Sequence, residues 1–190
     1  RWRFQFRRSV QIEGESVIDD FLCQYFSVRD FDGDGKMDIV ALFRNANYFP
    51  SAIILLDAAN GTLQGEYWHA GWLYQIREFP APNSAIIKIV AGGINNGFRL
   101  ADLLVLDPRN LSGQAPTSDG YTIPTVGKGS QEQYITFPRN GPEHLMTRLY
   151  NETGGISVAN DNIVVYVSEQ FEGKGYTVAI VQFDRSMNIT

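Results

Sequence analysis

The chain has 190 residues, of which 44% are hydrophobic and 19% are charged, and its formal net charge is −5 at pH 7. This balance excludes a disordered chain, and the length is enough to bury a sizeable core. The negative charge argues against a general nucleic-acid binder. The basic residues are uneven, because four arginines crowd the first eight positions: Arg1, Arg3, Arg7 and Arg8. A solvated strand edge is the ordinary explanation, and contact with anionic lipid or nucleic acid is the alternative.

The first residues alternate between apolar and polar side chains, with Trp2, Phe4 and Phe6 at every second position. A period of two predicts a strand with one apolar face. The lone cysteine, Cys23, has no partner for an internal disulfide. It lies in the apolar run 21–26, which predicts a buried strand, and we therefore expect a packed thiol rather than a nucleophile.

An acidic run follows, with aspartates at positions 1, 3, 5 and 9 of a loop: Asp30, Asp32, Asp34 and Asp38. A chain wrapped around one cation could direct these carboxylates inward. The backbone carbonyl of Lys36, at position 7, could add a ligand and water could complete the shell, because Ca²⁺ takes six to eight oxygens. Gly33 and Gly35 allow the positive φ angles that a tight wrap needs. Without a cation the four carboxylates would repel one another.

Three interpretations compete for this loop. An EF-hand needs Glu at position 12 and a following helix, whereas Ala41 stands there and residues 39–43 predict a strand. The strand-loop-strand context, with 26–28 before the aspartates, resembles the FG-GAP or VCBS repeat of integrin α-chain propellers and many bacterial surface proteins. That resemblance implies β-propeller blades and bound Ca²⁺. The third interpretation is a solvated acidic turn that binds no metal with useful affinity.

An internal repeat supports the second interpretation. A shift of 50 residues (107 − 57) places the run 39–41 on the identical run 89–91. The same shift aligns further identical residues: Asn45 with Asn95, Leu56 with Leu106, Asp57 with Asp107, Asn60 with Asn110 and Gln64 with Gln114. A period of about 40 to 50 residues is typical of propeller blades with four short strands. The loop aspartates align with Pro80, Pro82, Ser84 and Lys88, so we expect the second unit to lack the metal.

Residues 108–131 are rich in Gly, Pro, Ser and Thr and predict a long loop excursion. Strand patterns resume at 134–137, and 144–151 is the best candidate for a short helix. We expect one all-β domain over 1–190, built from FG-GAP-like β-propeller blades. About three four-stranded units are predicted, forming an open or partial propeller over approximately 28–77, 78–115 and 155–190.

Few groups of residues in the sequence could form a catalytic site. His69 lies beside Trp68 and close to Trp72, which predicts a packed aromatic cluster; the alternative is a platform on which sugar rings or a peptide stack. The sequence contains no transmembrane run of about 18 apolar residues and no signal peptide. Because the sequence starts at Arg1 rather than at a methionine, a membrane anchor upstream of Arg1 is an open expectation.

From these observations we expect a non-catalytic, calcium-stabilised module that presents blade loops to a protein or glycan partner and binds no nucleic acid. A calcium site of moderate affinity fills best outside the cytoplasm, so we expect a secreted, periplasmic or cell-surface location. One alternative is a propeller-type polysaccharide hydrolase or lyase with carboxylates near His69. Another is the outer sensor domain of a membrane-anchored regulator.

Overall fold

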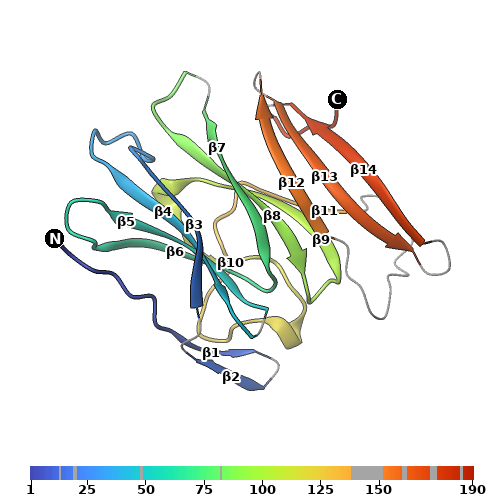
Figure 1. Cartoon of the computed structure of the whole chain (residues 1–190), viewed down its shortest axis with the longest axis horizontal. Helices are drawn as coiled ribbons and strands as arrows, with labels where there is room; N and C mark the ends of the chain where they lie inside the picture. Colours follow the sequence, from blue (N-terminus) through green and yellow to red (C-terminus); the bar gives the residue numbers. More distant parts are fainter. Residues whose placement is uncertain are drawn as a thin grey trace.

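The structure is a computed structural model, shown in Figure 1, and it describes residues 1–12, 14–18, 21–47, 49–81, 83–137, 152–159, 162–171, 175–184 and 186–190. In these ranges the regular structure is β-strand, apart from two short 3-10 turns, η1 (Pro108–Asn110) and η2 (Asp119–Tyr121). The expected all-β fold is therefore confirmed. The predicted short helix over 144–151 lies outside the described residues. No helix in the described ranges has the length and apolar character that crossing a membrane requires.

The described strands form four open sheets. An N-terminal hairpin pairs β1 (Ser9–Ile12) with β2 (Glu15–Ile18). The first sheet has the order β10 (Ser112–Gln114), β6 (Leu63–His69), β5 (Ser51–Asp57), β4 (Asp38–Asn45) and β3 (Phe21–Arg29). The second sheet has the order β11 (Gln133–Phe137), β9 (Leu100–Leu106), β8 (Ile87–Asn95) and β7 (Leu73–Pro80). The third sheet has the order β12 (Glu152–Ala159), β13 (Asn162–Phe171) and β14 (Gly175–Phe183).

The strand pairing of the first sheet recurs in the second sheet at a constant offset. Val40 of β4 pairs with Leu55 of β5, and Val90 of β8 pairs with Val105 of β9, 50 positions later (90 − 40 and 105 − 55). In each of the three larger sheets, the strand that comes first in the chain also has a β-bulge. The bulges lie at Cys23/Tyr25 in β3, at Leu73/Gln75 in β7 and at Thr153/Gly155 in β12. A bulge bends a strand and increases its twist, so the three sheets share one local distortion in addition to the antiparallel pairing of their consecutive strands.

The excursion over 108–131 interrupts the second sheet. In the first sheet β6 follows β5 after a short turn, whereas the strand beside β9 is β11, which begins only at Gln133. The fourth strand of the second sheet therefore lies beyond the expected unit 78–115. The excursion contains β10, a short strand that pairs in parallel with β6. It thus connects the second sheet back to the edge of the first.

Three apolar clusters hold the layers together. One lies between the first and second sheets and includes Leu42, Ile53, Ile76 and Leu104. Another lies between the second and third sheets and includes Leu103, Ile156, Val165 and Phe183. The last covers the opposite face of the first sheet, where the N-terminal residues Phe6, Val10 and Ile12 contact Ile54 and Trp68. The N-terminal segment and the third sheet thus lie at opposite ends of the layered structure (Figure 1).

The edge strand β3 corrects one expectation. Its apolar sequence predicted a buried strand with a packed thiol, but Cys23 is exposed, and Phe26 is 66% exposed. The reason is that β3 pairs only with β4 and forms the edge of the first sheet. Apolar composition indicates a strand here, while burial depends on which neighbours the strand acquires.

Candidate functional site

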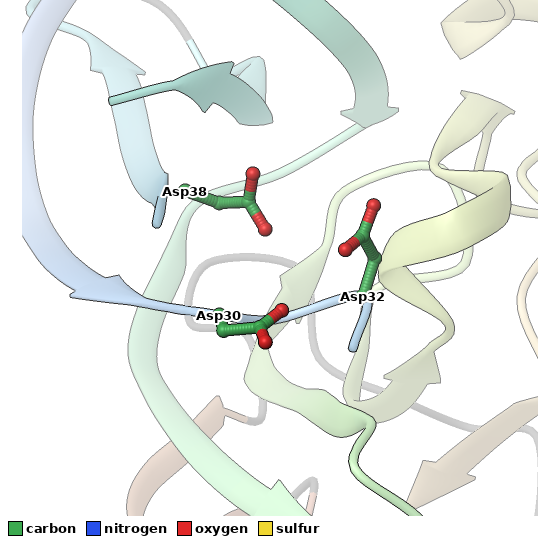
Figure 2. A group of neighbouring side chains, drawn as sticks. All are labelled: Asp30, Asp32 and Asp38. Atoms are coloured by element: carbon green, nitrogen blue, oxygen red, sulfur yellow. The ribbon is translucent and has the colours of Figure 1, made fainter. Parts of the chain in front are cut away.

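The acidic loop joins β3 to β4, and Figure 2 shows three of its side chains converging. Asp30, Asp32 and Asp38 each offer a carboxylate oxygen, and these three oxygens lie within 4.8 Å of one another. Asp30 follows the last residue of β3, and Asp38 is the first residue of β4. Because the antiparallel pair Arg29 and Asp38 closes the loop, the two ends of the acidic run are brought together by the strands themselves.

Backbone amides fix the first two carboxylates. Asp30 accepts hydrogen bonds from the amides of Gly33, at 2.8 Å, and Gly35, at 3.0 Å. Asp32 accepts one from the amide of Asp34 at 3.0 Å. The glycines have φ angles of 81° and 87°, in the left-handed region that favours glycine. The chain therefore wraps tightly around the carboxylates of Asp30 and Asp32.

The structure places Asp34 and Lys36 differently from the predicted ligand set. The Lys36 ammonium lies 3.0 Å from a carboxylate oxygen of Asp34, and the other oxygen accepts the Lys36 amide at 2.7 Å. The hydrogen bonds from Lys36 lower the pKa of Asp34. Three of the four predicted aspartates therefore converge, and the fourth is paired with a neighbouring side chain.

Asp38 is the buried member of the group, with 2% of its surface exposed. It accepts a hydrogen bond from the Phe31 amide at 3.1 Å. Burial raises the pKa of Asp38, and the nearby carboxylates of Asp32 and Asp34 raise it further. A cation among these oxygens would favour the ionised form and reverse this effect.

The loop also contacts the second sheet. Phe31 is 1% exposed and its ring belongs to the apolar cluster between the first and second sheets. Its carbonyl oxygen accepts a hydrogen bond from the Ile87 amide at 3.0 Å, at the start of β8. A Cβ on Gly33 would lie 3.1 Å from the Cβ of Ala85. The conformation of the acidic loop therefore affects how the two sheets meet.

The equivalent position of the second sheet carries a fixed positive charge. Lys88 stands 50 positions after Asp38 (88 − 38), and its ammonium lies 2.9 Å from Asp107 and 2.5 Å from Glu132. Arg109 also pairs with Asp107, at 2.5 Å. The hydrogen bonds from Arg109 and the one from Lys88 lower the pKa of Asp107. An ammonium group thus neutralises the carboxylates here.

The aromatic residues of the alternative ligand platform are mostly internal. Trp68 is 2% exposed and packs beside Phe6 and Phe21, and His69 is fully buried. Trp72 is partly exposed, with the Arg44 guanidinium 5.5 Å from its ring. Trp68 and His69 therefore belong to a packed cluster and do not face a ligand at the surface.

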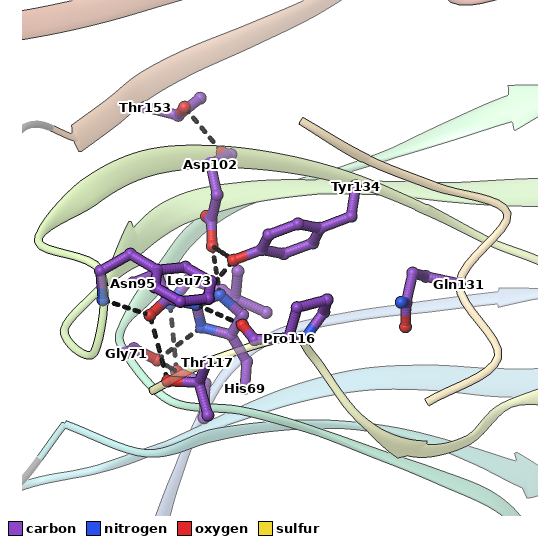
Figure 3. A network of polar contacts seen from close by, with 12 residues as sticks. His69, Gly71, Leu73, Asn95, Asp102, Pro116, Thr117, Gln131, Tyr134 and Thr153 are labelled. Carbon is purple, nitrogen blue, oxygen red and sulfur yellow. Dashed lines mark hydrogen bonds and ion pairs between the residues drawn. The ribbon is translucent and has the colours of Figure 1, made fainter. Parts of the chain in front are cut away.

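His69 belongs to a buried polar network, shown in Figure 3, whose central carboxylate is Asp102. One ring nitrogen of His69 contacts an oxygen of Asp102, and the other lies 3.1 Å from the Gly71 carbonyl. Tyr134 donates to the same Asp102 oxygen at 2.9 Å and accepts a hydrogen bond from Asn95 at 2.6 Å. Burial opposes the charge on His69, but Asp102 and the Gly71 carbonyl raise its pKa overall.

This network connects all three larger sheets. His69 lies on β6 and Asp102 on β9, while Thr153 of β12 donates a hydrogen bond to the Asp102 carbonyl at 2.8 Å. Asp102 and His69 are each 0% exposed, so a substrate has no access to them. One feature of the sequence points to this network, because Asp102 is a single acidic residue inside the apolar run 100–106. Its burial was not predicted.

Two surface cavities are candidate binding sites. One, of about 400 Å³, includes Lys88, Glu132 and Met187 in its lining. The other, also of about 400 Å³, is lined by the excursion and includes Asp119 and Lys128. Among the described residues each is lined by one carboxylate, so within this part of the chain neither has the pair that a glycoside hydrolase needs. Searches of protein-family models, curated proteins and solved structures found no match to this chain.

Proposed function

We propose that the chain is a non-catalytic β-sheet module whose first two sheets are fixed to each other by one calcium ion in the acidic loop. The observation that carries this proposal is the convergence of three carboxylates within 4.8 Å in a loop that contacts both sheets. Asp30, Asp32 and Asp38 would supply carboxylate oxygens. The Lys36 carbonyl and water would complete a shell of six to eight oxygens, which suits a hard cation.

The residues of the loop fit Ca²⁺ in chemical terms. All three convergent side chains are oxygen donors, and no nitrogen or sulfur ligand lies in their group. All three carboxylates accept hydrogen bonds from backbone amides, so little rearrangement is needed on binding. Asp34 would contribute a fourth carboxylate if calcium displaced the Lys36 ammonium from it. The ion would supply the positive charge that Lys88 supplies in the second sheet.

We further propose that the three larger sheets are FG-GAP-like repeat units of propeller-blade type. Support comes from the 50-residue offset shared by the sequence and by the pairing of β4 with β5 and of β8 with β9. The recurrent bulge extends the similarity to the third sheet. The role of such a module would be binding or scaffolding outside the cytoplasm, with a protein or glycan partner at the blade loops. The enclosure of His69 and Asp102 supports the absence of catalysis at that pair.

Thermal unfolding of metal-stripped protein tests the calcium proposal. Calcium at about 100 times its Kd should stabilise the fold by about 2.7 kcal/mol and raise the Tm by about 5–11 °C. Magnesium at the same concentration should give a smaller shift because it releases its water reluctantly. Asp32→Asn should lose most of the calcium shift, and Asp119→Asn, an exposed aspartate outside the loop, should keep it. A wild-type Tm that calcium leaves unchanged would refute the proposed site.

A further inference from the structure

The N-terminal segment, residues 1–8, lies against the first sheet with its apolar side inward. Phe6 is 3% exposed, and its ring stacks on Phe43 with 4.8 Å between centroids. Phe4 is half-buried in the same cluster. Arg1, Arg3 and Arg7 are exposed along the segment. The alternating sequence thus places three guanidinium groups toward solvent on an otherwise acidic protein.

Two contacts hold this segment in place. The Trp2 indole N–H donates to the Ala58 carbonyl at 3.1 Å, and its ring packs over Gly61. At the other end Arg8 pairs with Glu66 at 2.6 Å. The backbone of Arg3 and Arg7, between these contacts, is therefore held along the sheet before any partner binds, and Arg1 immediately precedes the first contact. Such preorganisation reduces the entropy that binding would otherwise lose.

The three exposed arginines differ from Arg8 in their pairing. Arg8 forms an ion pair with Glu66. No ion pair among the described residues involves Arg1, Arg3 or Arg7. Guanidinium groups bind phosphate oxygens in a bidentate manner and remain charged at any physiological pH. The segment therefore presents a row of exposed positive charge suited to an anionic partner.

Exposed apolar side chains adjoin one end of this row. Trp2 is 40% exposed and Met37 is 58% exposed. Both are next to Ala58, whose carbonyl accepts the Trp2 indole N–H and whose amide donates to the Met37 carbonyl at 3.0 Å. Aromatic and apolar side chains beside arginines are the composition of surfaces that lie in the headgroup region of a bilayer.

We propose that the N-terminal segment is a contact site for an anionic membrane surface, with Arg1, Arg3 and Arg7 on lipid phosphates and Trp2 and Met37 at the headgroup boundary. A polysaccharide or nucleic acid would use the arginines but would gain little from Met37, which favours the membrane. The contact is electrostatic and peripheral. It is therefore strongest at low ionic strength, because salt screens exposed charges over about 10 Å at 0.1 M. The three arginines lie outside the acidic loop, whereas Met37 lies within it, between Lys36 and Asp38.

Vesicle co-sedimentation of the whole chain tests this contact. The vesicles contain equal parts of phosphatidylglycerol and phosphatidylcholine, with pure phosphatidylcholine as the neutral comparison, and EDTA removes bridging by calcium. The variant replaces Arg1, Arg3 and Arg7 with Gln. A matched control replaces three exposed basic residues elsewhere, Arg77, Arg99 and Lys128, with Gln, so that both variants have the same net charge.

Wild type should bind the anionic vesicles and not the neutral ones. Each arginine near an anionic surface contributes about fivefold to binding, so the N-terminal variant should bind on the order of 100-fold more weakly. The control should bind within about threefold of wild type. Circular dichroism should show both variants folded. Three results would overturn the proposal: no binding of wild type to anionic vesicles, equal losses in the two variants, or binding to heparin without binding to vesicles.

Discussion

Replacement of Asp38 by Asn should have opposite effects in the absence and presence of calcium. Asn has nearly the same shape and keeps an oxygen that can accept the Phe31 amide, so the hydrogen bond at 3.1 Å can persist. The substitution removes one negative charge from a group whose oxygens lie within 4.8 Å of one another. The metal-free protein should therefore become more stable.

The size of this gain follows from the geometry. Two carboxylates at 4.8 Å repel each other by about 0.9 kcal/mol in water, and Asp38 has two such neighbours, Asp30 and Asp32. Relief of both repulsions gives about 2 kcal/mol at this separation, and salt screening reduces it. We expect a gain of about 1–2 kcal/mol in the free energy of unfolding without metal. Calcium at 100 times its Kd should add about 2.7 kcal/mol to wild type and almost nothing to the variant.

Urea unfolding followed by tryptophan fluorescence measures both quantities, with EDTA in one series and calcium in the other. The variant should be the more stable protein in EDTA, and wild type should be the more stable protein in calcium. Asp119→Asn, a charge-matched change outside the loop, should leave both curves close to those of wild type. Loss of stability in the metal-free Asp38→Asn protein, or a calcium effect that persists in this variant, would refute the prediction.

Three further predictions concern the second sheet, the buried network and the loop backbone. Lys88→Met should destabilise the fold by about 1–3 kcal/mol in urea, with or without calcium, because Asp107 loses a charged hydrogen-bond donor; an unchanged midpoint would contradict this. His69 has a raised pKa in the folded protein, so its ionised pair with Asp102 stabilises the fold fully below pH 6.5, and this contribution is lost as pH rises through the folded-state pKa. The Tm of wild type should therefore fall above about pH 6.5 more steeply than that of His69→Gln, and parallel curves would count against the pair. Gly33→Ala should weaken calcium binding and reduce the free energy of unfolding by about 1–2 kcal/mol, because φ is 81° there and the new methyl group would approach Ala85. Isothermal calorimetry measures the calcium affinity and thermal melts measure the stability. If neither changes, the loop tolerates a side chain and the prediction is wrong.

The sequence was most informative where short-range pattern determines structure. The runs around Val40 and Val90 are apolar and partly β-branched, which predicted strands that the structure contains as β4 and β8. Spacing in the acidic loop was also informative, because a tight turn between paired strands returns Asp38 to the neighbourhood of Asp30. Both inferences needed only neighbours within one hairpin.

The sequence was least informative where long-range contacts decide the outcome. Cys23 is exposed because β3 has a neighbour on one side only, a fact of sheet order. Asp102 is buried because His69 and Tyr134 reach it from strands far away in the chain. The pairing of Asp34 with Lys36 is local, but the spacing of the aspartates does not reveal whether the Asp34 carboxylate lies with the other carboxylates or contacts the Lys36 ammonium. Such features depend on tertiary packing that residue pattern does not specify.

Equilibrium dialysis of metal-stripped protein against calcium measures the central property directly, because it counts bound ions without reference to stability. Wild type should bind one calcium ion per chain, and Asp38→Asn should bind none at the same free concentration. A wild-type protein that holds no calcium after dialysis, or an Asp38→Asn variant that holds as much as wild type, would contradict the proposed site.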